Sequence, residues 1–276
     1  MQPTLGLIYL TFRELWAKKV VLGLFIVSSL ILIMVAFALN LDVVDGSLAG
    51  LRLFGQTPDG NMEGLSLERL VFGVESAVAG ASYWIGILLA LFATAPLIVS
   101  LLERGHIDLL LSKPMSRSTL FLGHVTGVWI AVAVLALYLL GGVWLIMSIK
   151  TGIWNSSFLL SIGLVVLMFG VMYSTVALMG VWTESTALAL IVSYGLIFAS
   201  IVLAASDAIL EELDMVGSTA FLALYHIMPN FAEVTGIIAS LSQAEPVESW
   251  YPLWSSMIFG AVAYALAAWW FSRRDF

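Results

Sequence analysis

The chain has 276 residues, of which 61% are hydrophobic and 11% are charged, and its formal net charge is −7. Soluble domains are about 45–50% apolar and about 25% charged, so this composition excludes a soluble globular protein. The sequence contains no cysteine, which excludes disulfides, cysteine-ligated metal centres and cysteine nucleophiles.

Six apolar runs are long enough to cross a bilayer, which requires about 20 residues each. They cover residues 20–39, 77–102, 120–149, 158–182, 187–205 and 253–271. The sequence therefore predicts an all-α, polytopic membrane protein with six transmembrane helices in a single domain, 1–276. Two longer segments, 40–76 and 206–252, then lie on one side of the membrane, and a charged loop, 103–119, lies on the other.

Basic residues set the orientation, because cytoplasmic loops carry an excess of Lys and Arg. With both termini in the cytoplasm, only Arg52, Arg69 and Lys150 face outward. The eight that face inward are Arg13, Lys18, Lys19, Arg104, Lys113, Arg117, Arg273 and Arg274. This bias predicts a multi-pass protein of the cell's inner membrane with cytoplasmic termini.

The residues before the first run show an amphipathic helical pattern. Leu5, Ile8, Phe12 and Leu15 recur at helical spacing, with basic residues beside them. The pattern predicts an N-terminal interfacial helix on the inner leaflet. The alternative is a cytoplasmic extension of the first transmembrane helix.

The first outer segment contains signals for a hairpin and a helix. Asp45-Gly46 lies between the apolar runs 41–44 and 51–54, which permits a small hairpin. The helical spacing of Leu67, Leu70, Val71 and Val74 indicates an amphipathic helix. This helix begins near Glu63 and leads into the second transmembrane helix. The segment is either a cap lying on the membrane or a docking surface for an extracytoplasmic partner.

The second outer segment contains two apolar pieces, Thr219–Met228 and Phe231–Leu241, separated by Pro229-Asn230. Each piece is too short to span a membrane, and proline interrupts helical hydrogen bonding. We expect a broken, re-entrant pair or a helix at the outer interface. Tyr225, Pro229 and Asn230 are candidates for an outer gate, and the alternative is a passive lid.

Charged side chains are missing from all six apolar runs. Proton-coupled transport is therefore disfavoured, since it places ionisable groups within the membrane. His124 and His226 are expected to be packed or interfacial residues, because neither has an acid or a second His at helical spacing. Zinc-protease, serine-hydrolase and phosphate-loop motifs are all missing, so we expect no enzyme activity and no bound cofactor in this chain. We also expect no binding of nucleic acid.

The loop between the second and third runs combines charges with a short apolar pattern. Ile107, Leu110 and Leu111 recur at helical spacing between Gly105 and Pro114. Charges lie close by at Glu103, Arg104 and Asp108. This predicts a short amphipathic helix that can place its apolar face in a groove of a partner protein.

This loop resembles the permease subunits of type-2 ABC transporters, in which an acidic residue closes span two, a Gly and a Leu-rich turn follow, and Ser-x-Pro-x-Ser-Arg leads into span three. The matching residues are Glu103, Gly105, Leu109-Leu110-Leu111 and Ser112-Lys113-Pro114-Met115-Ser116-Arg117. The resemblance extends to Tyr225-x-x-x-Pro229-Asn230 and to the closing residues Phe271 to Phe276. It is nearest to the branch that includes permeases for copper-enzyme maturation. His124 stands where Lys is usual.

The resemblance implies a permease subunit of an ATP-driven exporter that works by alternating access. Two copies, or two close paralogues, would pair with two ABC ATPase subunits, and those subunits would bind ATP and magnesium. The implied coupling residues are Glu103, Arg104, Gly105, Asp108, Leu110, Leu111, Pro114, Ser116 and Arg117. Glu184, in the turn 183–186, is either a second inner contact or part of a simple helix turn. The alternative function is a non-transporting membrane anchor or assembly factor that recruits a cytoplasmic partner.

Overall fold

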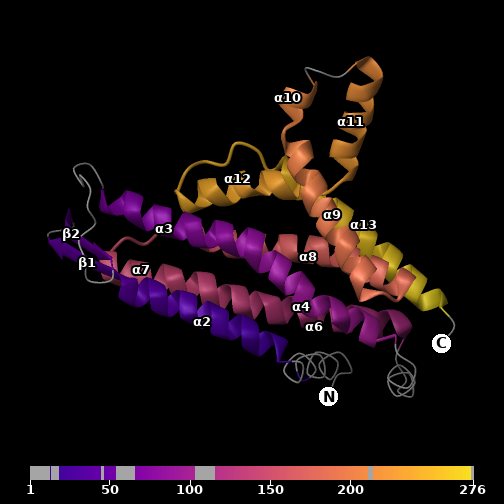
Figure 1. Ribbon diagram of the computed structural model, residues 1–276, viewed down its shortest axis with the longest axis horizontal. Coiled ribbons are helices and arrows are strands. Elements are labelled where there is room, and N and C mark those ends of the chain that lie inside the picture. The colour runs from indigo at the N-terminus through magenta and orange to yellow at the C-terminus, as the bar shows by residue number, and fades with distance from the viewer. Residues whose placement is uncertain are drawn as a thin grey trace.

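The computed structural model describes Arg13 and residues 19–44, 47–53, 66–102, 116–210 and 214–274. In these ranges the chain is predominantly helical, and its long helices lie side by side in one bundle (Figure 1). Five described helices are long and apolar enough to cross a membrane, and two shorter helices joined at a bend reach that length together. The predicted helical architecture is thus confirmed in the described residues, with about five to six long apolar helices that are suited to crossing a membrane. The predicted N-terminal interfacial helix lies outside the described residues.

Two of the long helices contain a π-helical turn. The first has 34 residues and consists of α3 (Leu67–Ala81), η1 (Ser82–Gly86) and α4 (Ile87–Ser100). The second has 35 residues and consists of α6 (Arg117–Ala136), η2 (Leu137–Gly141) and α7 (Gly142–Thr151). At 1.5 Å per residue each is about 50 Å long, so each must tilt or project beyond a hydrocarbon layer of about 30 Å.

The predicted amphipathic helix before the second apolar run is present as α3. It begins at Leu67, where the side chain of Ser66 accepts a hydrogen bond of 3.2 Å from the backbone N–H of Arg69. This contact satisfies one of the free N–H groups of the first turn. Leu67, Leu70 and Val71 are buried, as their spacing indicated. The helix continues into the apolar run without a break.

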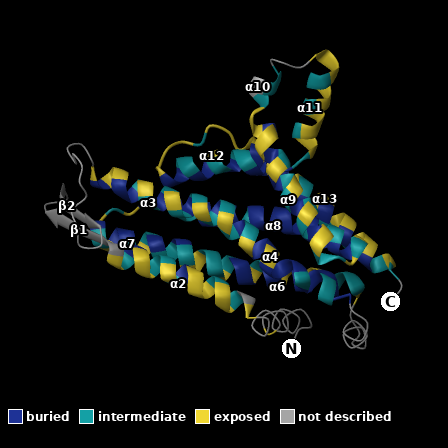
Figure 2. Cartoon of the chain, viewed as in Figure 1, coloured by how far each residue is buried: buried dark blue, intermediate teal, exposed yellow. Residues whose placement is uncertain are grey.

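The remaining long helices are α8 (Phe158–Thr183), α9 (Thr186–Ala204) and α13 (Tyr251–Arg273). In the most apolar part of α8, 72% of the residues are buried, against 28% in α9 and α13. α8 is therefore the central helix of the bundle, and α4, α9 and α13 pack against it. Figure 2 shows burial concentrated along these contacts and exposed faces on the outer helices.

The first apolar run forms α2 (Val20–Ala38), a shorter apolar helix that is not among the five candidate spans and leads directly into a hairpin. β1 (Leu39–Val44) pairs antiparallel with β2 (Ser47–Leu53), and Val44 lies opposite Ser47. The predicted hairpin is confirmed. Its second strand begins at Ser47, earlier than the apolar run 51–54 indicated.

The predicted break before the last apolar run is also confirmed. α10 (Ser206–Leu210) and α11 (Met215–Ile227) project from the bundle, whereas α12 (Phe231–Ser242) lies along α3 (Figure 1). α11 and α12 meet at an angle of 60°. None of the described side chains of α11 is buried, while α12 buries its apolar face.

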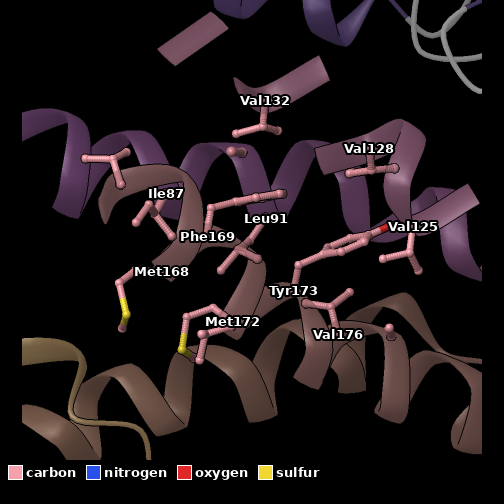
Figure 3. Close-up of a cluster of buried hydrophobic side chains, with 14 of the residues drawn as sticks. Ile87, Leu91, Val125, Val128, Val132, Met168, Phe169, Met172, Tyr173 and Val176 are labelled. Atoms are coloured by element: carbon pink, nitrogen blue, oxygen red, sulfur yellow. The ribbon is translucent and has the colours of Figure 1, made fainter. Parts of the chain in front are cut away.

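Apolar side chains of α4, α6 and α8 fill the centre of the bundle, including Leu91, Val128 and Phe169 (Figure 3). A close approach of three helices occurs at Gly170 of α8. A Cβ atom at this position would lie 1.8 Å from Cζ2 of Trp129, so only glycine fits beneath the indole ring. The Trp129 ring N–H donates to the hydroxyl of Tyr264 (2.9 Å), which donates to the carbonyl of Gly170 (2.8 Å).

Candidate functional site

One end of the bundle carries the start of α6, the turn between α8 and α9, and the C-terminal end of α13 (Figure 1). We call it the inner end, after the orientation that the distribution of basic residues predicts. α4 also ends here, at Ser100, so both helices that flank the predicted coupling segment reach this end. Glu103, Arg104, Gly105, Asp108, Leu110, Leu111 and Pro114 lie outside the described residues.

Ser116 marks the point at which the predicted coupling segment enters the bundle. Its backbone is extended, and its side-chain oxygen accepts a hydrogen bond of 3.1 Å from the backbone N–H of Thr119. Serine in this position caps the first turn of a helix. α6 therefore begins at Arg117, three residues earlier than the apolar run suggests.

Arg117, Glu184 and Arg274 form what we call the inner clasp. The Arg117 guanidinium donates to the backbone carbonyl of Arg274. The Arg274 guanidinium in turn pairs with the Glu184 carboxylate and donates to the carbonyl of Val181. The clasp joins three segments that are distant in sequence: the start of α6, the end of α8 and the end of α13.

Glu184 owes its position to the end of α8. Its backbone is left-handed (φ 54°), and its N–H donates to the carbonyl of Gly180 at 3.0 Å. This conformation stops the helix, and α9 begins two residues later at Thr186. The Glu184 side chain is 57% exposed and that of Arg274 is 23% exposed. The sequence singled out Arg117 and Glu184, but not the contact of either residue with Arg274.

The candidates for an outer gate, Tyr225, Pro229 and Asn230, lie at the bend between α11 and α12. Pro229 and Asn230 are buried. The Asn230 backbone N–H donates to the hydroxyl of Ser256 (3.0 Å), and its side-chain amide donates to that of Ser255 (3.1 Å). Both serines belong to α13, so the bend is fixed to the last long helix. We call this contact the outer junction.

Aromatic and titratable side chains surround the outer junction. The Tyr225 hydroxyl donates to the Glu233 carboxylate at 2.8 Å, and its ring stacks on that of Tyr251. His226 contacts the Tyr251 hydroxyl through Nδ1. On the buried side, the hydroxyl of Tyr83 donates to the carbonyl of Phe231 at 2.6 Å. The start of α12 is thus attached to α13 through Asn230 and to η1 through Phe231.

A buried carboxylate was missed by the sequence analysis. Glu75 of α3 is fully buried, and its Oε2 accepts a hydrogen bond of 2.8 Å from the side-chain amide of Asn155. The same amide donates to the carbonyl of Ser242 at 2.9 Å. Oε1 of Glu75 is buried without a hydrogen-bond partner among the described residues. This polar cluster joins α3, the α7–α8 connection and the end of α12.

The described part of the chain contains no group of three or more His, Asp or Glu side chains placed to hold a metal ion. His124 is buried on α6, and His226 is exposed on α11.

In comparisons with known proteins, no family model and no curated protein matches this chain. The likeness to type-2 ABC permeases therefore rests on the residues quoted above.

Proposed function

We propose that the chain is the membrane-spanning permease subunit of an ATP-driven ABC exporter, and that a separate ATPase chain binds ATP and magnesium. The observation that carries this proposal is the inner clasp. Arg117 lies at the C-terminal end of the coupling segment and is tied through Arg274 to the α8–α9 turn. A partner bound to that segment would therefore act on several helices at once.

The two long helices that flank the coupling segment support a mechanical role. α4 and α6 begin or end at the segment and continue through η1 and η2 to the opposite end of the bundle. A pull on the segment would tilt both helices, and the clasp would carry α8, α9 and α13 with them. π-helical turns are frequent at functional sites and allow a helix to bend.

We further propose that the outer junction gates the pathway at the opposite end. α12 is attached to α13 and η1 at its start, whereas α11 buries none of its described side chains. The bend at Pro229-Asn230 is therefore the point at which α11 can move relative to α12. The alternative, a passive lid, predicts that Asn230→Ala changes neither transport nor the ATP turnover of the complex.

The coupling role can be tested by photo-crosslinking in cells. A photoreactive amino acid replaces Leu110 in the coupling segment, and a second variant carries it at Leu122, an exposed apolar residue of α6. We expect position 110, but not position 122, to crosslink to a chain that a photoreactive ATP analogue also labels. Leu110→Asp should release that chain on purification, because it places a charge on the apolar contact face.

The alternative function, an anchor or assembly factor, predicts a different crosslinking partner. In that case position 110 would capture a chain that the ATP analogue does not label, and our proposal would be wrong. The proposed second permease copy and any extracytoplasmic partner are separate questions. They are tested by the mass of the purified complex and by crosslinking from the hairpin end of the bundle.

A further inference from the structure

Aromatic and basic side chains gather at the end of α13. Trp269, Trp270, Arg273 and Arg274 line a groove of about 280 Å³. The two Trp side chains are 48% and 43% exposed, so the groove opens to the surroundings of the bundle. Trp182 of α8 stands edge-on to Trp270, with the ring centres 6.3 Å apart. We call the pocket lined by Trp269, Trp270, Arg273 and Arg274 the Trp–Arg groove.

The two arginines of the Trp–Arg groove differ in their partners. Arg274 is paired with Glu184 in the inner clasp. Arg273 lies over the ring of Trp269, 4.3 Å from its centre, and has no carboxylate partner among the described residues. Asp275, the next acidic residue in the sequence, lies outside those residues. The described groove therefore carries an uncompensated positive charge on an aromatic surface.

An apolar stripe leads along α13 to the groove. Ile258, Val262 and Leu266 follow one another at a spacing of four residues, and each is exposed. In a helix this spacing places them on one face, which continues toward Trp269, Trp270 and Arg273. A single surface thus offers hydrocarbon contacts along its length and a cationic, aromatic site at its inner end.

We propose that the Trp–Arg groove binds the phosphate headgroup of an anionic phospholipid of the inner leaflet. The guanidinium of Arg273 supplies donors that suit phosphate oxygens. Tryptophan is enriched at the level of lipid headgroups, and the cytoplasmic leaflet carries the anionic lipids. The stripe on α13 would contact the acyl chains, which free phosphate lacks. The proposal rests on the orientation within the proposed function and does not depend on an ATPase or on transport.

Native mass spectrometry of the purified full-length chain tests the proposal. The protein is offered equal amounts of phosphatidylglycerol and phosphatidylcholine with identical acyl chains, and the retained lipids are counted. We expect a preference for phosphatidylglycerol that falls about fivefold in Arg273→Gln, the effect of one basic residue near a membrane surface. Arg69→Gln is the matched control, because Arg69 is also exposed but lies at the opposite end of the bundle. Arg273→Lys should retain most of the preference.

Three results would overturn the proposal. Equal retention of the two lipids by the wild type would mean that the tryptophans anchor the helix without recognising a headgroup. An equal loss of the preference for phosphatidylglycerol in Arg69→Gln and Arg273→Gln would mean that the preference depends on the overall charge of the protein and not on the groove. Displacement of the lipid by excess inorganic phosphate would mean that the groove binds a free anion. Lipid retention does not require an ATPase partner. This experiment can therefore succeed even if the proposed transport function is wrong.

Discussion

Arg274 of α13 and Glu184 of the α8–α9 turn form an ion pair at the inner end of the bundle. The backbone carbonyl of Arg274 also accepts a hydrogen bond from Arg117, so one residue contacts two helices that are distant from it in sequence. The Glu184 side chain is more than half exposed, and exposed pairs stabilise a fold by at most about 1 kcal/mol. The role that we infer for the pair is therefore to hold the ends of the helices in position relative to one another.

Removal of this pair should widen the distribution of distances between α9 and α13 with little loss of stability. Spin labels at Ala187 and Ser272 report that distance, and the chain contains no native cysteine to interfere. Arg274→Gln is expected to broaden the measured distribution and to lower the free energy of unfolding by about 1 kcal/mol or less. Arg273→Gln is the control, because Arg273 takes no part in the clasp. Identical distributions in both variants would contradict a positioning role for Arg274.

Gly170 should tolerate no side chain. In Gly170→Ala the new methyl group would overlap the ring of Trp129, and overpacking of this kind costs about 1–3 kcal/mol. Gly163 belongs to the same helix and has open space around its Cα, so Gly163→Ala is the matched control and should be neutral or stabilising. Unfolding in detergent measures both effects. Equal stability of the two variants would show that Trp129 moves away freely.

Hydropathy and spacing predicted the elements that depend on neighbouring residues. The long helices, the amphipathic start of α3, the pairing of β1 with β2 and the break at Pro229-Asn230 all follow from local patterns. The second apolar run was expected to begin at Ala77, so Glu75 was expected in the amphipathic helix that precedes it and not among the buried residues. The structure includes Glu75 in the same continuous helix and buries its side chain.

The sites that the sequence did not predict depend on contacts between distant residues. Glu75 is buried because Asn155 supplies a hydrogen bond, and 80 positions separate the two residues. Arg117 and Arg274 are 157 positions apart. A single sequence contains no periodicity that pairs such residues, so their roles become visible only when the helices are packed.

Asn155 should be important for stability, because its side-chain amide satisfies two buried acceptors at once. Asn155→Ala would leave both Glu75 and the carbonyl of Ser242 without this donor, and each unsatisfied buried group costs about 1–3 kcal/mol. We expect a clear loss of thermal stability. Gln243→Ala, at an exposed position next to Ser242, should have almost no effect. A small effect of Asn155→Ala would indicate that other donors replace it.

The orientation of the chain can be checked by labelling single cysteines in intact cells. Glu245→Cys lies in the exposed α12–α13 connection, and Glu184→Cys lies in the exposed α8–α9 turn. An impermeant thiol reagent should label position 245 and not position 184, because the basic residues cluster at the end that carries Glu184. After the cells are opened, both positions should react. Labelling of position 184 in intact cells would reverse the orientation and with it the proposed place of the ATPase.

The two serines of the outer junction should differ in importance, because they accept different groups of Asn230. Ser256 is fully buried and accepts the backbone N–H, whereas Ser255 is partly buried and accepts the side-chain amide. A buried backbone N–H that loses its acceptor costs about 1–3 kcal/mol. Ser256→Ala should therefore lower the melting temperature more than Ser255→Ala. If Ser255→Ala is the more damaging variant, the Asn230 side chain, and not its backbone, holds the bend between α11 and α12.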